Sequence, residues 1–247
     1  PCTRADHRNR RRRNGTFPVH RVLPGLSKAP KRGTMPFADA DEGDAIKPKE
    51  LPMCGVVGLT YGEHTDQLGT EASRLLIHLE YRGYDSTGLA CIDEKDKVTL
   101  RKDVGAPTAV VRRLDLSSLT GQKAIGQVRW ATYGSVTPTN AQPHVMSCLT
   151  PLTGAHNGNI SNTDQLKAFL LRQGHRVLSD NDGEMLMHLI EHHLAPLLPP
   201  GGATPQDLPQ VIQAIRAAHA GVEGSYAACL AVPGIPGLFA IKAGSSL

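Results

Sequence analysis

Hydrophobic and polar residues change their spacing several times along the chain, and these changes predict a mixture of helices and strands. Between residues 66 and 78 the apolar side chains recur every three or four positions, which predicts an amphipathic helix. The same spacing predicts three further helices, over residues 163–172, 182–194 and 211–219. Asn162 or Thr163 is the expected N-cap of the first of these three helices.

Short apolar runs bounded by Gly, Pro, Asn and Asp predict the strands. They cover residues 54–62, 87–92, 98–102, 124–129, 226–232 and 238–243. A strand pair is also expected on the two sides of TPLTG, ending at AHNG, with loops over 130–144 and 195–209. Strands and helices do not alternate regularly, so an α+β fold is favoured over a doubly wound parallel sheet.

The first 53 residues show neither the helical nor the strand pattern of apolar residues. They contain a block of like charge, RNRRRRN, and a stretch rich in Pro, Gly and basic residues, PGLSKAPKRGTMP. No apolar segment marks a secretory signal, and Ser27 is the single serine of this region, which is poor for a transit peptide. We expect residues 1–53 to be a disordered leader, a propeptide or a misplaced start, and the folded domain to occupy residues 54–247.

The net charge of +4 on the 247 residues is unevenly distributed. Residues 1–53 hold 12 Lys and Arg against 6 Asp and Glu, net +6, whereas residues 54–247 hold 15 against 17, net −2. A nearly neutral body with 4% aromatic residues argues against a nucleic-acid partner. No apolar stretch approaches the ~20 residues of a membrane-spanning helix, so no membrane association is expected.

The five cysteines are odd in number, widely spaced and without a CxxC pair. This pattern excludes a zinc ribbon and a disulfide scaffold, and favours a reduced, cytoplasmic setting. Cys91, Cys148 and Cys229 fall in predicted apolar strands, where we expect them to be core residues.

The segment HLIEH fits the H-x-x-E-H pattern of some zinc proteases, with His188 and His192 on one face of a predicted helix. The helix also has an apolar face, and no clear third ligand is evident nearby in the sequence. Because such short motifs often occur by chance, no metal site is expected.

Cys54 follows Met53 and precedes a short strand with closely spaced glycines. If Met53 were the removed initiator, Cys54 would carry a free α-amine with a pKa of about 7.7–8.0 beside a nucleophilic thiol. One residue would then supply both nucleophile and base. Taken alone, Cys54 is better explained as a buried strand cysteine, since free cysteines are often core residues.

Several clusters of polar residues and glycines favour a catalytic role for Cys54 over a buried strand cysteine, because functional sites are commonly built where such clusters end apolar elements. They are LEYRGYDSTG, VRWATYG, NAQPH, AHNGNISN and LSDNDGEM. Together with MCGVVG they resemble the glutaminase domain of class II glutamine amidotransferases, the N-terminal-nucleophile type. The resemblance runs from Met53 almost to Leu247. Within that class, LEYRGYDS is most similar to the glucosamine-6-phosphate synthases.

The resemblance implies a four-layer αββα sandwich of α+β class and hydrolysis of glutamine without a metal or organic cofactor. Cys54 would attack the side-chain amide, and Asn157 and Gly158 would donate hydrogen bonds to the oxyanion. Arg82 and Gly83 would border the nucleophile.

The substrate's two charged ends need opposite partners. By the resemblance, Arg129 would bind the α-carboxylate of glutamine and Asp182 its α-ammonium group. Trp130 and Thr132 would lie on a loop that closes over the substrate.

The same resemblance implies that ammonia passes to fructose-6-phosphate, bound by sugar-isomerase domains that this chain lacks and through which a homodimer would form. Two alternatives stay open: a phosphoribosyl acceptor, favoured by NAQP, or a non-catalytic glutamine-binding module if the leader is retained. Tyr133, Gln142 and Gly183 depart from the residues common in the aminosugar enzymes, which have His, His and Thr there.

Overall fold

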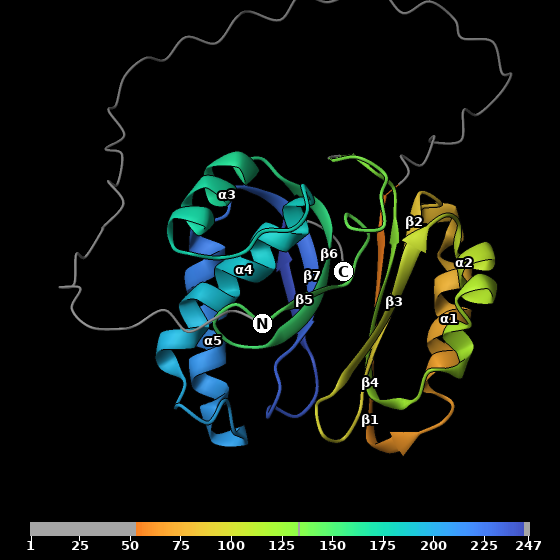
Figure 1. Cartoon of the computed structure of the whole chain (residues 1–247), viewed down its shortest axis with the longest axis horizontal. Helices are drawn as coiled ribbons and strands as arrows, with labels where there is room; N and C mark the ends of the chain where they lie inside the picture. Colours follow the sequence, from red (N-terminus) through yellow and green to blue (C-terminus); the bar gives the residue numbers. More distant parts are fainter. Residues whose placement is uncertain (1–52, 133, 245–247) are drawn as a thin grey trace, which may run out of the picture. The chain divides into compact units, whose positions relative to one another are not determined.

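In the computed structural model, which describes residues 53–132 and 134–244, two antiparallel sheets lie face to face between two layers of helices (Figure 1). The expected four-layer αββα sandwich is therefore confirmed. The expectations for residues 1–52 lie outside the described residues.

The first sheet has the strand order β1-β4-β2-β3. Its strands are β1 (Gly55–Thr65), β2 (Ser86–Ile92), β3 (Val98–Val104) and β4 (Gly121–Arg129). The helices α1 (Leu68–His78) and α2 (Pro107–Arg113) cover its outer face (Figure 1). Leu76 of α1 and Leu89 of β2 are fully buried in the apolar core between these two layers.

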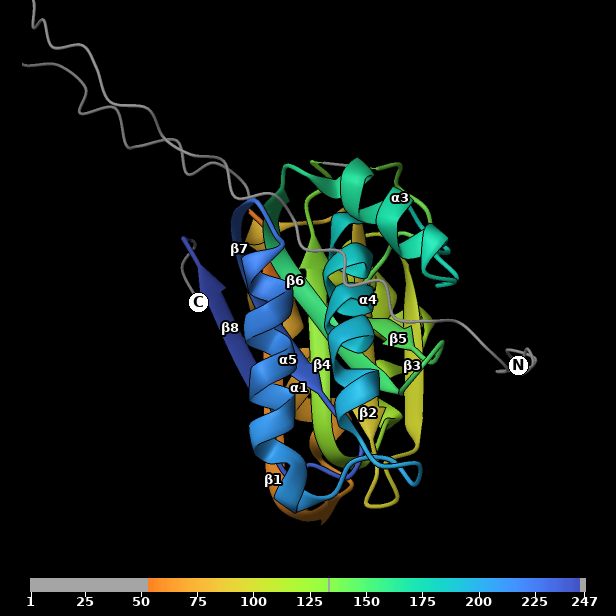
Figure 2. The same cartoon turned by 90° about the vertical axis from the view of Figure 1, so that its left-hand side faces the viewer.

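The second sheet has the order β5-β6-β7-β8. Its strands are β5 (His144–Met146), β6 (Leu152–Ile160), β7 (Gly224–Ala231) and β8 (Phe239–Ala243). Its outer face is covered by α3 (Thr163–Arg172), α4 (Asp182–Leu194) and α5 (Leu208–Ala220), of which α4 and α5 lie side by side (Figure 2). Short 3-10 turns occupy Glu80–Arg82, Leu116–Ser118, Ala195–Leu197 and Pro205–Asp207.

The layer between the sheets is filled mainly by small and branched apolar side chains. Ile92 and Ile125 of the first sheet pack there with Ala155 and Ala231 of the second. All seven residues of β2 are buried, which explains why its second half, LACI, is apolar without alternating.

The helices predicted over 163–172 and 182–194 are found with the same bounds. Asn162 stands at the N-cap of α3, but its side chain bonds Gly221 O at 2.9 Å and Glu223 N at 3.1 Å instead of capping the helix. Cys91 is buried, as expected, whereas Cys148 is not a strand residue. It lies half-buried in the loop after β5, because β5 ends at Met146.

None of the helices described between residues 53 and 244 has the length and apolar character of a membrane-spanning segment.

Candidate active site

Cys54 lies directly before β1, beside the end of β4. The antiparallel register pairs Gly55 with Val128, which places Cys54 next to Arg129 and Trp130. The Cys54 thiol donates to Trp130 O at 3.3 Å, and Trp130 N–H donates to Cys54 Sγ at 3.3 Å. The backbone N–H and carbonyl of Trp130 therefore both hold the Cys54 sulfur in place.

The environment of Cys54 favours the neutral thiol. Burial raises the pKa of Cys54, and the negative charge of Asp182 adds to the increase. The hydrogen bond from Trp130 and the positive charge of Arg129 act in the opposite direction without cancelling it. A nucleophile at this position therefore needs a base to accept its proton near neutral pH.

A cavity of about 530 Å³ opens beside the thiol and extends between the two sheets. Three of the predicted site residues line it: Cys54, Arg82 and Asn157. Its far end is formed by apolar and small side chains, among them Cys229 and Leu238. The cavity is thus polar where the thiol lies and apolar beyond it.

Asn157 and Gly158 lie on β6, in the sheet that faces Cys54. Asn157 is paired with Ala227 of β7 and is 9% exposed. Gly158 has φ +147°, and a Cβ there would lie 2.2 Å from Ser225 O. Glycine is therefore required at this position by both the backbone conformation and the close approach of β7.

Arg129 has a buried guanidinium that holds the loop following β4. It donates to Ser135 O at 3.1 Å and to Gly134 O at 3.3 Å. Burial lowers the pKa of Arg129, while Cys54, Asp182 and Asp85 raise it in part. The residue predicted to bind the substrate carboxylate is thus attached to the loop predicted to close over the substrate.

The YRGYDS segment packs against the same end of β4. A Cβ on Gly83 would lie 2.4 Å from Arg129 C, so the two backbones can approach only because this residue is glycine. Asp85 accepts a hydrogen bond from Ala131 N at 2.8 Å. Arg82 lies over the ring of its neighbour Tyr81, with its guanidinium carbon 5.6 Å from the ring centroid.

Asp182 begins α4, and its carboxylate points to β6. It accepts a hydrogen bond from Ile160 N at 3.0 Å and lies 3.3 Å from His156 Nε2. Burial opposes ionisation of Asp182, but its contact with His156 and the bonded backbone N–H groups lower its pKa overall. A buried carboxylate that stays ionised is suited to a cationic ligand.

Trp130 and Thr132 both lie on the loop after β4. The Trp130 ring meets that of Tyr84 edge to face, with centroids 4.9 Å apart. Thr132 is exposed. The structure thus places these two residues near the thiol end of the site without defining a contact with substrate.

His156 lies within the AHNGNISN cluster but was not among the predicted site residues. Gln142 Nε2 is 3.0 Å from His156 Nδ1, and Gln142 Oε1 accepts a hydrogen bond from His156 N at 2.7 Å. A Cβ on Gly183 would lie 2.2 Å from the same His156 Nδ1. Two of the three departures from the aminosugar enzymes therefore meet at one buried histidine.

Residues 129–230 match the family described as Glutamine amidotransferase domain. This match and the four-layer fold identify the described part of the chain as a class II glutamine amidotransferase domain, of the N-terminal-nucleophile type.

Within this class, the chain is similar to enzymes named glutamine–fructose-6-phosphate aminotransferase (isomerizing). It is 42% identical to the one from Aeropyrum pernix over 142 residues, which are 58% of this chain and 23% of the relative. It is 33% identical to that of Sulfolobus acidocaldarius over 190 residues, 77% of this chain and 30% of the relative. The chain thus spans less than a third of the length of these curated relatives.

A solved structure shares the fold. The glutamine phosphoribosylpyrophosphate amidotransferase from B. subtilis, complexed with ADP and GMP, aligns with a TM-score of 0.55 at 28% identity, covering 73% of this chain and 35% of that one.

Proposed function

We propose that the chain hydrolyses the side-chain amide of glutamine, with Cys54 as the nucleophile once the bond after Met53 has been cut. The observation that carries this proposal is the thiol of Cys54 held at the polar end of a cavity that Asn157 also lines. Met53 is 41% exposed, so the peptide bond to be cut is accessible.

In the proposed reaction the Cys54 sulfur attacks the amide carbon while its proton passes to the new α-amine of the same residue. The Asn157 side-chain N–H and the Gly158 backbone N–H donate to the oxyanion of the tetrahedral intermediate. Collapse of this intermediate breaks the C–N bond, and the α-ammonium returns the proton to the leaving ammonia. Water then cleaves the thioester, giving glutamate and the free thiol.

The remaining predicted residues position the substrate. Asp182, buried and ionised, would pair with the α-ammonium of glutamine, and the planar fork of Arg129 would bind the α-carboxylate. The contacts of Arg129 with Gly134 and Ser135 would then couple substrate binding to the position of the loop that carries Trp130 and Thr132. Arg82 and Gly83 would form the wall beside the nucleophile.

We further propose that the ammonia serves fructose-6-phosphate, bound by sugar-isomerase domains outside this chain, in a cytoplasmic homodimer assembled through those domains. The names of the curated relatives support this acceptor. A phosphoribosyl acceptor is the alternative, supported by the NAQP segment and the structural neighbour. The sequence encoded downstream of Leu247 distinguishes them.

The test compares the 247-residue chain with one that starts at Met53, each checked by intact mass. We expect the chain that begins at Cys54 to release glutamate and ammonia from glutamine. Cys54→Ala should lower kcat/KM by at least about 10³-fold, as expected for loss of a nucleophile. Cys91→Ala, which removes a buried thiol on the helix side of the first sheet, is the matched control and should change it only a few-fold.

Full glutamine hydrolysis by the trimmed Cys54→Ala variant would refute the assignment of the nucleophile. A trimmed wild-type chain that binds glutamine and releases no ammonia would favour the non-catalytic binding module.

A further inference from the structure

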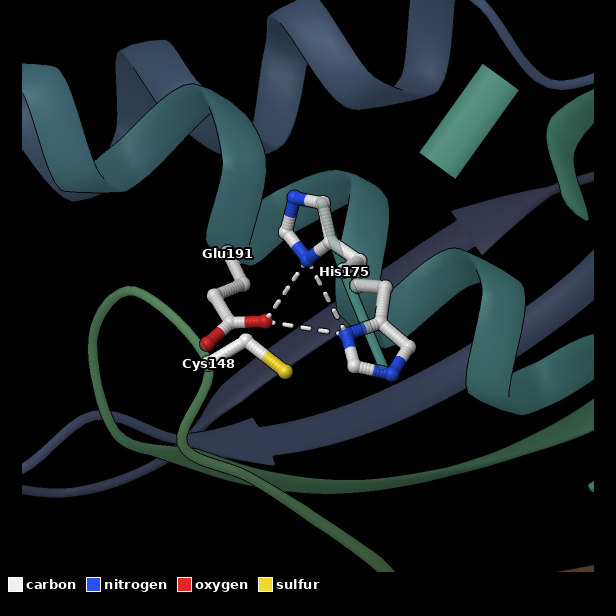
Figure 3. Close-up of side chains that lie close together, drawn as sticks. Cys148, His175 and Glu191 are labelled. Carbon is white, nitrogen blue, oxygen red and sulfur yellow. Dashed lines mark hydrogen bonds and ion pairs between the residues drawn. The ribbon is translucent and has the colours of Figure 1, made fainter. Parts of the chain in front are cut away.

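A second cluster of reactive side chains lies away from Cys54, at the outer face of the second sheet. Cys148 comes from the loop after β5, His175 from the segment between α3 and α4, and His188 and Glu191 from α4. We propose that these four side chains form a zinc site. In Figure 3 the Cys148 sulfur, the His175 ring and the Glu191 carboxylate converge on one small region.

The distances between the ligand atoms suit a tetrahedral ion. His175 Nδ1 lies 3.3 Å from His188 Nδ1, and Glu191 Oε2 lies 3.2 Å from the first nitrogen and 2.9 Å from the second. Bonds of about 2.0–2.2 Å at tetrahedral angles give ligand separations of about 3.3–3.6 Å. All four ligand atoms, including Cys148 Sγ, lie within 4.8 Å of one another.

The cluster is buried, which distinguishes it from a chance group of surface residues. His175 and Glu191 have fully buried side chains, and that of His188 is 2% exposed. Three ionisable groups are costly to remove from water unless they are paired or bind an ion. Cys148 is half-buried, so the site lies close enough to the surface for an ion to enter.

The outer nitrogen of each of the two rings faces a further polar side chain. His188 Nε2 lies 3.5 Å from Glu184 Oε1, and His175 Nε2 lies 3.2 Å from His192 Nδ1. A carboxylate behind a metal-binding histidine orients the ring and increases its basicity.

The carboxylate ligand is oriented in the same way. Glu191 Oε1 accepts a hydrogen bond from Leu149 N at 2.7 Å, which leaves Oε2 directed at the two histidines. The residue after Cys148 thus fixes the orientation of Glu191.

The mixture of one thiolate, two imidazoles and one carboxylate favours zinc over calcium or magnesium, which prefer oxygen ligands alone. Four protein ligands leave no open position, so the ion would be structural. It would attach two loops to α4, the helix whose first residue is Asp182.

The sequence pattern HLIEH does not describe this site. Its first histidine and its glutamate are ligands, but His192 lies behind His175 instead of binding the ion. Cys148 and His175 are far from the motif in sequence, which is why no third ligand was evident.

The experiment uses the untagged 247-residue chain, stripped with a chelator and titrated with zinc sulfate against a chromophoric competitor. We expect one zinc per chain, and a Tm that rises on binding because zinc binds the folded state. Cys54→Ala should bind equally, which excludes the active-site thiol as the ligand. Glu184→Gln should weaken binding by 10–100-fold, the usual effect of losing a partner behind a ligand.

Cys148→Ser is the decisive variant, because it is a conservative change at a half-buried loop position. It should lower zinc affinity by more than about 100-fold, and the cobalt form should lose its near-ultraviolet sulfur charge-transfer band. His219→Ala, on α5, is the matched control and should bind as the wild type does. Equal zinc affinity in Cys148→Ser and wild type, or no zinc binding at micromolar concentration in the wild type, would overturn the proposal.

Discussion

Replacing Gly158 by alanine is expected to destabilise the domain strongly, because this glycine is confined by its backbone angle and by a neighbouring strand at once. Its φ of +147° lies in a region that side-chain-bearing residues rarely adopt. A Cβ would also lie 2.2 Å from Ser225 O and 2.5 Å from Tyr226 Cα, both backbone atoms of β7. Since β7 is an interior strand of the second sheet, it cannot move away without disturbing β6 and β8.

The two effects can be separated with Gly174→Ala. Gly174 also has positive φ, +86°, but a Cβ there would meet nothing within 4 Å. This control should cost only the left-handed backbone penalty, about 1–2 kcal/mol. Gly158→Ala adds overpacking of about 1–3 kcal/mol to backbone strain of about 1–3 kcal/mol. We therefore expect a total loss of about 2–6 kcal/mol.

Urea unfolding followed by circular dichroism measures both variants. The midpoint should fall further for Gly158→Ala than for Gly174→Ala, at an unchanged slope. If Gly158→Ala is no less stable than Gly174→Ala, the close approach of β7 does not constrain this position and the argument for glycine there is wrong. In the chain that begins at Cys54, glutaminase activity should also fall for Gly158→Ala and not for Gly174→Ala.

Three further predictions concern the same site. The pKa of Asp182 in the folded chain is lowered despite burial, so ionised Asp182 stabilises the fold. This stabilisation is fully present above the pKa of about 3.9 that Asp has in the unfolded chain. It is lost as the pH falls through the lower pKa of Asp182 in the folded chain. The difference in urea midpoint between wild type and Asp182→Asn should accordingly narrow below pH 4, and a constant difference would contradict it. Burial raises the pKa of Cys54. In the 247-residue chain, the pH at which iodoacetamide alkylates Cys54 at half its maximal rate should therefore lie above the pKa of about 8.5 of a free cysteine. Peptide mass spectrometry measures this rate. Gly183→Thr and Gln142→His both change the surroundings of His156. The double variant should therefore be more stable than the sum of the two single effects predicts, with a coupling free energy of about 0.5–3 kcal/mol. Urea midpoints that change in a strictly additive way would argue against the shared contact with His156.

Most elements, including the short strands β2, β3 and β8, could be predicted from the sequence, but helix α2 could not. The helices over 163–172 and 182–194 have enough apolar positions to define both ends. Helix α2 was missed because its seven residues contain two adjacent valines, which favour a strand, and bury only Pro107 and Val110. Strand β1 extends to Thr65 beyond its predicted end, because Thr65 pairs with Gly121 of β4 after an irregularity in the register that follows Thr60.

The site was only partly accessible from the sequence for a related reason. The clusters of polar residues indicated which segments meet, but hydrogen-bond partners across the fold leave no local pattern. The contacts of Arg129 with the carbonyls of Gly134 and Ser135 depend on the path of a loop. The convergence of Gln142 and Gly183 on His156 likewise depends on how α4 packs against β6.

Because Cys54 leads into β1 of one sheet and Asn157 lies on β6 of the other, the distance between the proposed nucleophile and its proposed amide donor depends on the side chains that fill the middle of the sandwich. The small side chains of Ala155 and Ala231 keep this layer thin. A bulkier residue at either alanine would push the two sheets apart and weaken the proposed reaction without touching either of the two groups.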